Sequence, residues 1–164
     1  MKKITFTLLL AFAFLLTNNM NAQEYKSAVG LRLGYPLSAS YKHFLNDRSA
    51  FEVTAGFRGY TYYSWFNVGA YYLIHNEIPS IDGLKWYYGG GANVYFWNWD
   101  SGFDYGDSSN VSFGISGVIG LDYAFSEIPL NLSADWIPTF FINGYGNGFG
   151  GGYGGLSARY ILGR

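Results

Sequence analysis

The chain has no cysteine and few charged residues. Cysteine is absent from all 164 positions, which excludes disulfides, thiolate metal sites and a lipid anchor attached to cysteine. Lys, Arg, Asp and Glu together make up 13% of the sequence, whereas they make up about 25% of an average soluble protein. A soluble protein with so few charges would have trouble covering its surface. The composition therefore favours a protein whose exterior faces something other than water.

Long apolar runs are also scarce. The one run near the start, Ile4 to Leu16, has 13 residues, fewer than the ~20 that a transmembrane helix needs. It follows two lysines and precedes a polar stretch that ends at Ala22, which is the order of a secretory signal peptide. We therefore predict a Sec-type signal peptide over residues 1–22 and a single domain over residues 23–164.

The chain also lacks an excess of positive charge. The signal peptide carries two of the 10 basic residues and none of the 11 acidic ones. The mature chain therefore has a net charge of −3, from 8 basic and 11 acidic residues. Nucleic-acid binding needs a basic surface, so we predict no nucleic-acid partner.

What the sequence does have is strict alternation. From Val111 to Phe125 the odd positions are mostly apolar, whereas the even positions are mostly small or polar and include one charge, Asp122. A period of two is typical of a β-strand whose faces meet different surroundings. The stretch exceeds the about five or six residues of a soluble strand and suffices for the about 9–11 of a membrane strand. We interpret the apolar face as lipid-facing and the small face as lining a narrow barrel.

Seven further stretches alternate in the same way, separated by turn signals such as Pro36. The predicted strands cover residues 25–35, 37–45, 49–60, 64–74, 84–97, 111–125, 130–140 and 153–162. Closure is required because unpaired backbone groups cannot face lipid. We therefore predict an all-β fold, an eight-stranded antiparallel up-and-down transmembrane β-barrel. Both termini are then periplasmic, and the loops 98–110 and 143–152 lie outside.

The alternation places eight charged residues on the inner face: Arg32, Lys42, Glu52, Arg58, Lys85, Asp122, Asp135 and Arg159. An eight-stranded barrel is just wide enough for side chains to fill, and confined charges must pair to offset their loss of water. We therefore predict a lumen charge network; a narrow polar path or a small ligand site is the alternative. A three-residue turn at 46–48 places Lys42 opposite Glu52.

Few residues point to catalysis or metal binding. Asp100, Asp104 and Asp107 could gather calcium, but their spacing is not that of a dedicated calcium loop, and we interpret them as a solvated acidic loop. The glycine-rich loop 143–152 precedes a strand and not a helix, which argues against a phosphate site. Aromatic residues at the outer strand ends predict an interfacial belt. They are Tyr60, Tyr62, Tyr63, Trp65, Trp97, Trp99, Phe140 and Phe141.

Several segments resemble a known group of proteins. They are Tyr41-Lys42-His43-Phe44, residues 86–91, Gly120-Leu121-Asp122-Tyr123, residues 128–133 and the ending Tyr160-Ile161-Leu162. With the signal peptide and the eight strands, the chain resembles the small OmpA/OmpX-like outer-membrane β-barrel proteins, and in particular an uncharacterised outer-membrane β-barrel family. The resemblance implies a monomer in the cell outer membrane, in contact with outer-membrane lipid and lipopolysaccharide and inserted by the barrel assembly machinery.

We therefore expect a structural or surface-interaction role, no enzymatic activity, no cofactor and no metal. One alternative is an envelope lipid-modifying enzyme, similar to lipid A deacylases or acyltransferases. Those use a histidine with a serine and an acid, and neither His43 nor His75 has the deacylase His-x-Ser spacing. A second alternative is a soluble lipocalin-like periplasmic ligand carrier, in which the apolar face would point inward.

Overall fold

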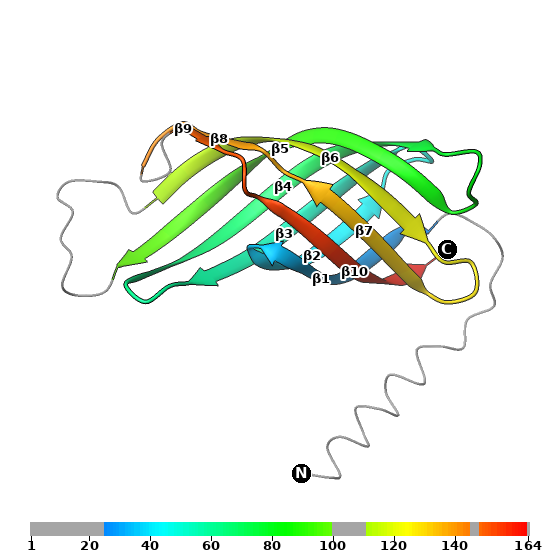
Figure 1. Ribbon diagram of the computed structural model, residues 1–164. Coiled ribbons are helices and arrows are strands. Elements are labelled where there is room, and N and C mark those ends of the chain that lie inside the picture. The colour runs from blue at the N-terminus through cyan, green and yellow to red at the C-terminus, as the bar shows by residue number, and fades with distance from the viewer. Residues whose placement is uncertain (1–24, 100–110, 145–147, 164) are drawn as a thin grey trace, which may run out of the picture.

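A computed structural model describes residues 25–99, 111–144 and 148–163 (Figure 1). The predicted signal peptide, residues 1–22, lies outside these ranges. The described part is built from β-strands, as predicted, and it contains no helix long and apolar enough to cross a membrane. The strands are β1 (Ser27–Tyr35), β2 (Leu37–Phe44), β3 (Ser49–Gly59), β4 (Tyr63–Glu77), β5 (Leu84–Trp99), β6 (Val111–Ala124), β7 (Leu130–Trp136), β8 (Thr139–Phe141), β9 (Gly148–Gly150) and β10 (Gly154–Gly163).

The sheet closes on itself. Its strands run in the order β5-β4-β3-β2-β1-β10-β7-β6, and the pairing of β6 with β5 completes the ring. All of the pairings are antiparallel. Closure gives the strands of this ring a hydrogen-bonded neighbour on both sides, which the edge strands of an open sheet in lipid would lack. The predicted fold class is therefore confirmed: the protein is a closed eight-stranded antiparallel barrel.

The ten strand segments form eight barrel strands because two strands are interrupted. β7 and β8 pair with β6 in one continuous register, Trp136 opposite Ile119 and Thr139 opposite Ser116. Pro138 divides them because proline has no N–H to donate to the ladder, although its carbonyl still accepts from Gly117 N at 3.0 Å. The sequence predicted one unbroken strand over residues 130–140, so this break corrects it.

The eighth strand is interrupted by one extra residue. Gly154 pairs with Trp136 and Gly150 with Thr139, so three residues of the eighth strand face two of the seventh. An odd insertion reverses the faces of a strand. Phe149 is therefore exposed outside at 70%, whereas Tyr153 packs inside. The predicted loop 143–152 is wrong over residues 148–150, where β9 pairs with β8.

The two faces of the wall are divided as predicted. The outward face carries large exposed apolar side chains, such as Leu31 at 58% and Ile115 at 60% exposure. The inward face carries the buried polar and charged residues, among them Lys42 and Asn93. This facing is the reverse of the one that a soluble carrier with an apolar interior would need.

The two ends of the barrel differ. β1 begins and β10 finishes at one end, which we call the terminal end (Figure 1). The turns 45–48, 78–83 and 125–129 also lie there. β4 ends at Glu77, three residues beyond the predicted end at residue 74, so His75 belongs to a strand and not to the connection before the next predicted strand. The opposite end, with the turns at Pro36 and at residues 60–62, is called the loop end.

Candidate functional site

Six of the eight predicted inward charges meet in the middle of the lumen. We call them the central charge cluster: Arg32, Lys42, Glu52, Asp122, Asp135 and Arg159. Every one of their side chains is at most 4% exposed. They come from β1, β2, β3, β6, β7 and β10, so the cluster joins most of the barrel wall. Three are cations and three are anions, and the formal charge of the cluster is zero.

Glu52 is the centre of the cluster. Its Oε1 accepts a 2.5 Å hydrogen bond from Arg159 Nη2 and lies 3.8 Å from Arg32 Nη1. Its Oε2 lies 3.8 Å from Lys42 Nζ. The register places Lys42 directly opposite Glu52, as the length of the 46–48 turn predicts. One carboxylate therefore serves three cations.

Lys42 has a closer partner across the lumen. Its Nζ lies 2.9 Å from Asp122 Oδ1, against 3.8 Å to Glu52. Asp122 Oδ2 also accepts hydrogen bonds from Tyr25 Oη at 3.0 Å and Asn131 Nδ2 at 2.9 Å. The Lys42 ammonium further lies 4.6 Å from the centre of the Tyr87 ring. The shortest ion pair of Lys42 therefore joins β2 to β6 and not to its neighbour β3.

The remaining cluster members are also hydrogen-bonded. Arg159 donates to Ser40 Oγ at 2.6 Å and to Ser133 Oγ at 2.7 Å. Asp135 pairs with Arg32 and accepts from Tyr87 Oη at 2.7 Å. Buried charges need such hydrogen bonds as well as an opposite charge. The alternation within residues 84–97 and 130–140 places Tyr87 and Asn131 on the inner face, but it does not identify them as partners of the carboxylates.

The other two predicted inward charges lie toward the ends of the lumen. Arg58 lies at the loop end, with its guanidinium carbon 5.2 Å from the Tyr35 ring and 5.4 Å from the Tyr60 ring. Lys85 lies at the terminal end, with its Nζ 5.8 Å from the Phe44 ring. Neither forms part of the central charge cluster as defined above.

A layer of uncharged polar side chains lies above the cluster toward the loop end. Asn93 holds it together, because its amide accepts from Tyr71 Oη at 2.7 Å and donates to Ser116 Oγ at 2.7 Å. Ser116 Oγ lies 2.7 Å from Thr139 Oγ1. Gly69 makes room for this layer, since a Cβ there would lie 2.3 Å from Asn93 Oδ1. The small inward residues of the sequence therefore accommodate larger inward partners.

Aromatic side chains fill the lumen at the loop end. We call this group the aromatic plug: Trp65, Tyr95 and Phe141, with Tyr35, Tyr63, Trp97 and Tyr153 packed against them. The predicted interfacial belt is therefore wrong for Trp65 and Phe141, which are 1% and 3% exposed. Both occupy positions that the alternation itself places inward. The alternation within residues 25–35 places Tyr35 on the outward face with Leu31, yet its ring lies 5.6 Å from that of Trp65.

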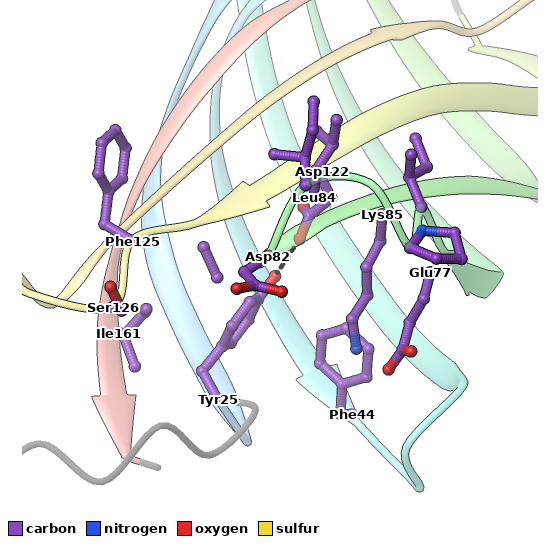
Figure 2. A pocket seen from close by; sticks show the side chains of 15 residues that line it. Tyr25, Phe44, Glu77, Asp82, Leu84, Lys85, Asp122, Phe125, Ser126 and Ile161 are labelled. Atoms are coloured by element: carbon purple, nitrogen blue, oxygen red, sulfur yellow. Dashed lines mark hydrogen bonds between the residues drawn. The ribbon is translucent and has the colours of Figure 1, made fainter.

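The terminal end of the lumen holds a cavity of about 470 Å³, which we call the terminal cavity (Figure 2). Its wall includes the segment before β1, the ends of β2, β4 and β6, and the 78–83 turn. Tyr25 and Asp122 connect it to the central charge cluster. Burial and the nearby Asp122 carboxylate both raise the pKa of Tyr25 well above its ordinary value. A second cavity, between the cluster and the aromatic plug, has only about 20 Å³, roughly enough for one water.

His75 is buried behind the terminal cavity without polar partners. It is 1% exposed, and neither ring nitrogen has a hydrogen-bond partner among the described residues. Its ring stacks on Tyr87 at 4.9 Å and lies 4.7 Å from the Phe44 ring. These contacts make His75 an aromatic packing residue in this barrel.

His43 has a different environment on the outer wall. Its Nδ1 lies 2.8 Å from Ser27 Oγ, and the Tyr41 hydroxyl donates to the same oxygen at 3.4 Å. A serine hydrogen-bonded to a histidine is two-thirds of a hydrolase triad. No acidic side chain is hydrogen-bonded to His43 among the described residues. A Ser/His pair without an acid also serves simply as a polar contact at the membrane interface.

Metal binding finds little support in the described ranges. They contain no group of three or more His, Asp and Glu side chains arranged to hold an ion. The aspartates considered for calcium, Asp100, Asp104 and Asp107, lie outside the described residues.

Comparisons with known proteins agree with this geometry. No family model matches the chain, and no curated protein matches it. The solved structure of Neisserial surface protein A, an eight-stranded outer-membrane barrel, superposes with a TM-score of 0.58. The match has 18% sequence identity and covers 83% of this chain and 93% of the other. The protein has the fold of the small eight-stranded outer-membrane β-barrels. In such a barrel, the outward apolar face described above is the face that meets lipid.

Proposed function

We propose that this protein is an integral outer-membrane barrel with a structural or surface-interaction role and no open pore. The observation that carries the proposal is the division of the wall, with large apolar side chains outside and a balanced charge cluster inside. A protein with this division is stable only where lipid covers its outer face. We infer that it acts as a monomer surrounded by outer-membrane lipid and lipopolysaccharide, and that the barrel assembly machinery inserts it after signal-peptide removal.

The orientation follows from this placement. A Sec-exported mature chain enters the outer membrane from the periplasm, so the terminal end faces the periplasm and the loop end faces outside. The filled lumen supports a role that does not depend on solute passage. Nothing in the charge balance supports a nucleic-acid partner.

Fractionation and folding test the proposal together. The protein should be recovered with outer membranes, be extracted only by detergent, and migrate on a gel differently before and after heating. In planar bilayers the folded barrel should give no conductance steps. Recovery as a soluble monomer without detergent would overturn the membrane assignment, and regular conductance steps would overturn the filled lumen.

A second candidate function rests on Ser27 and His43. Their 2.8 Å contact on the lipid-facing wall has the geometry of a nucleophile and its base. A fluorophosphonate probe should leave the folded wild-type protein unlabelled under the proposed non-enzymatic role. Labelling that disappears in Ser27→Ala and in His43→Gln would favour a lipid-modifying enzyme instead.

A further inference from the structure

We propose that the terminal cavity binds a small organic cation with an apolar body, admitted from the periplasmic side. The inference rests on the proposed function for the direction in which the cavity opens. The site itself is argued from the size, the lining and the charge of the cavity.

The cavity has the composition of a small-molecule site. Its volume of about 470 Å³ falls within the ~300–1,000 Å³ typical of ligand pockets. Apolar side chains form most of the wall, and three of the lining residues are aromatic: Tyr25, Phe44 and Phe125. Aromatic faces attract cations as well as apolar groups. An apolar body with one positive charge therefore suits this wall.

The charges of the lining favour a cation over an anion. Glu77, Asp82, Asp122 and Lys85 line the cavity. Asp122 is neutralised by Lys42, which lies 2.9 Å away and outside the lining. The remaining charges of the lining are two carboxylates, those of Glu77 and Asp82, and one ammonium, that of Lys85. Glu77 and Lys85 stand on the same side of the cavity and Phe125 and Ile161 on the other (Figure 2), so a ligand between them meets both charge and apolar surface.

Access is from one end. Toward the loop end, the central charge cluster and the aromatic plug fill the lumen, and the cavity between them has only about 20 Å³. The terminal cavity therefore does not continue through the barrel. A ligand that reaches it comes from the periplasm and leaves in the same direction.

The wall of the cavity is held in place. In the 78–83 turn, Ile81 N donates to Ile78 O at 3.0 Å. The turn is tied to the end of β6 by a 2.9 Å bond from Ala124 N to Gly83 O. Gly83 has φ +80, and a Cβ there would lie 2.4 Å from Ala124 O, so this close approach requires glycine. A site that is formed before its ligand arrives loses less entropy on binding.

Two kinds of molecule carry a cation on an apolar body. A free amine or guanidine with an apolar body fits the description, and so does a lysine side chain beside an apolar residue in a peptide. We therefore name the shared group, a cation on an apolar body, and test both sources. The probes are fluorophenyl-butylamine as the free amine and acetyl-phenylalanyl-lysine amide as the peptide.

Binding is measured by fluorine NMR, and for the peptide by its competition with the fluorinated amine. The full mature barrel is placed in phosphatidylcholine nanodiscs, which carry no net lipid charge, and empty nanodiscs give the background. The amine should bind saturably, whereas fluorophenyl-butyrate, of the same shape and opposite charge, should not. Competition by the peptide at a similar concentration would assign the site to both sources. Without it, the site takes only free amines.

Matched variants locate the binding. Glu77→Gln with Asp82→Asn should weaken amine binding about tenfold, the combined effect of two partly solvated charges. The control, Asp47→Asn with Glu127→Gln, removes two exposed acids from turns at the same end that do not line the cavity, and should leave binding unchanged. Lys85→Met removes the competing cation and should strengthen amine binding.

Two outcomes of the binding experiment would overturn the inference. Binding that the amine and the butyrate share equally, or that both double variants weaken equally, would assign it to general surface attraction. No saturable binding would remove the site. Failure of this test is distinct from failure of the proposed function, because each sample is first shown to migrate as a folded, heat-modifiable barrel. A protein that does not fold in nanodiscs contradicts the membrane assignment itself.

Discussion

Glu52 on β3 and Arg159 on β10 are joined by a 2.5 Å hydrogen bond across the lumen. Two strands, β2 and β1, separate them in the wall, so the contact exists only because the barrel is narrow. Both side chains are at most 2% exposed. The pair therefore links two strands that are not neighbours in the wall, at a buried position. We expect its loss to destabilise the barrel as a whole.

Glu52→Gln should destabilise the barrel strongly. The change leaves Arg159 without its carboxylate and removes the shared anion near Arg32 and Lys42. Breaking a buried ion pair in this way costs about 3–5 kcal/mol of unfolding free energy. Urea unfolding in detergent micelles measures it. Glu127→Gln, an exposed acid in a turn, is the control, and an equal loss in both variants would contradict the role of the cluster.

Lys42 should be coupled more strongly to Asp122 than to Glu52. The Nζ of Lys42 lies 2.9 Å from Asp122 but 3.8 Å from Glu52. Double-mutant cycles with Lys42→Met, Asp122→Asn and Glu52→Gln separate the two energies, which for contacting residues are about 0.5–3 kcal/mol. Lys42→Met alone should cost less than Glu52→Gln, because both of its anions keep other partners. A larger coupling to Glu52 would mean that the cross-strand pair dominates.

Leu31→Arg should impair folding into bilayers more than Leu45→Arg. The two leucines are equally exposed, at 58%, but Leu31 lies mid-strand in β1 and Leu45 in the turn after β2. An outward arginine costs roughly 2–4 kcal/mol at the bilayer midplane and about 0–1 kcal/mol near its surface. A folding titration into lipid vesicles compares them. Equal costs would mean that Leu31 does not lie deeper in the bilayer than Leu45.

His75→Phe should stabilise the barrel by about 1 kcal/mol. The imidazole nitrogens have no hydrogen-bond partner among the described residues, and a buried polar group in that state is costly. Phenylalanine keeps the ring contacts with Tyr87 and Phe44. The control His75→Ala removes the ring and should destabilise by several times as much. A loss of stability in His75→Phe would reveal a polar role for the imidazole.

Tyr60 should ionise earlier than an ordinary exposed tyrosine. Its hydroxyl lies 3.1 Å from that of Tyr35, and hydrogen bonding by Tyr35 and by Arg58 lowers the pKa of Tyr60 below its ordinary value of 10.0. Both interactions favour the phenolate, so Arg58→Gln should move the pKa of Tyr60 upward. Carbon NMR of ring-labelled tyrosine, with Tyr60→Phe for assignment, follows the titration. An unchanged pKa in Arg58→Gln would exclude the arginine as a cause.

Much of the wall could be predicted because a strand has a period of two. The alternation predicted the inward faces of Lys42, Glu52 and Arg159, and the turn at 46–48 predicted the register of Lys42 with Glu52. Both are local properties of one strand or one hairpin. They need no knowledge of how the barrel closes.

Contacts across the lumen could not be predicted in the same way. Which inward side chain of β6 meets Lys42 depends on the tilt and stagger of the closed barrel, and alternation contains neither. The extra residue before Gly154 could not be predicted because it lies in a run of glycines. Glycine has no side chain whose polarity could show that the faces of the strand reverse there. The aromatic plug was missed for another reason, because Trp65 was grouped by residue type although its position is inward.

The exact balance of three cations and three anions in the central charge cluster constrains how such a sequence can change. A substitution that removes the charge at any one of the six positions leaves an unmatched charge, at a cost comparable to much of the ~5–15 kcal/mol that stabilises an average domain. Descendants of this chain should therefore exchange these charges in compensating pairs, as Lys42 with Asp122 or Arg159 with Glu52. Substitutions in the lumen would then occur in pairs, whereas residues on the lipid-facing wall would be substituted one at a time.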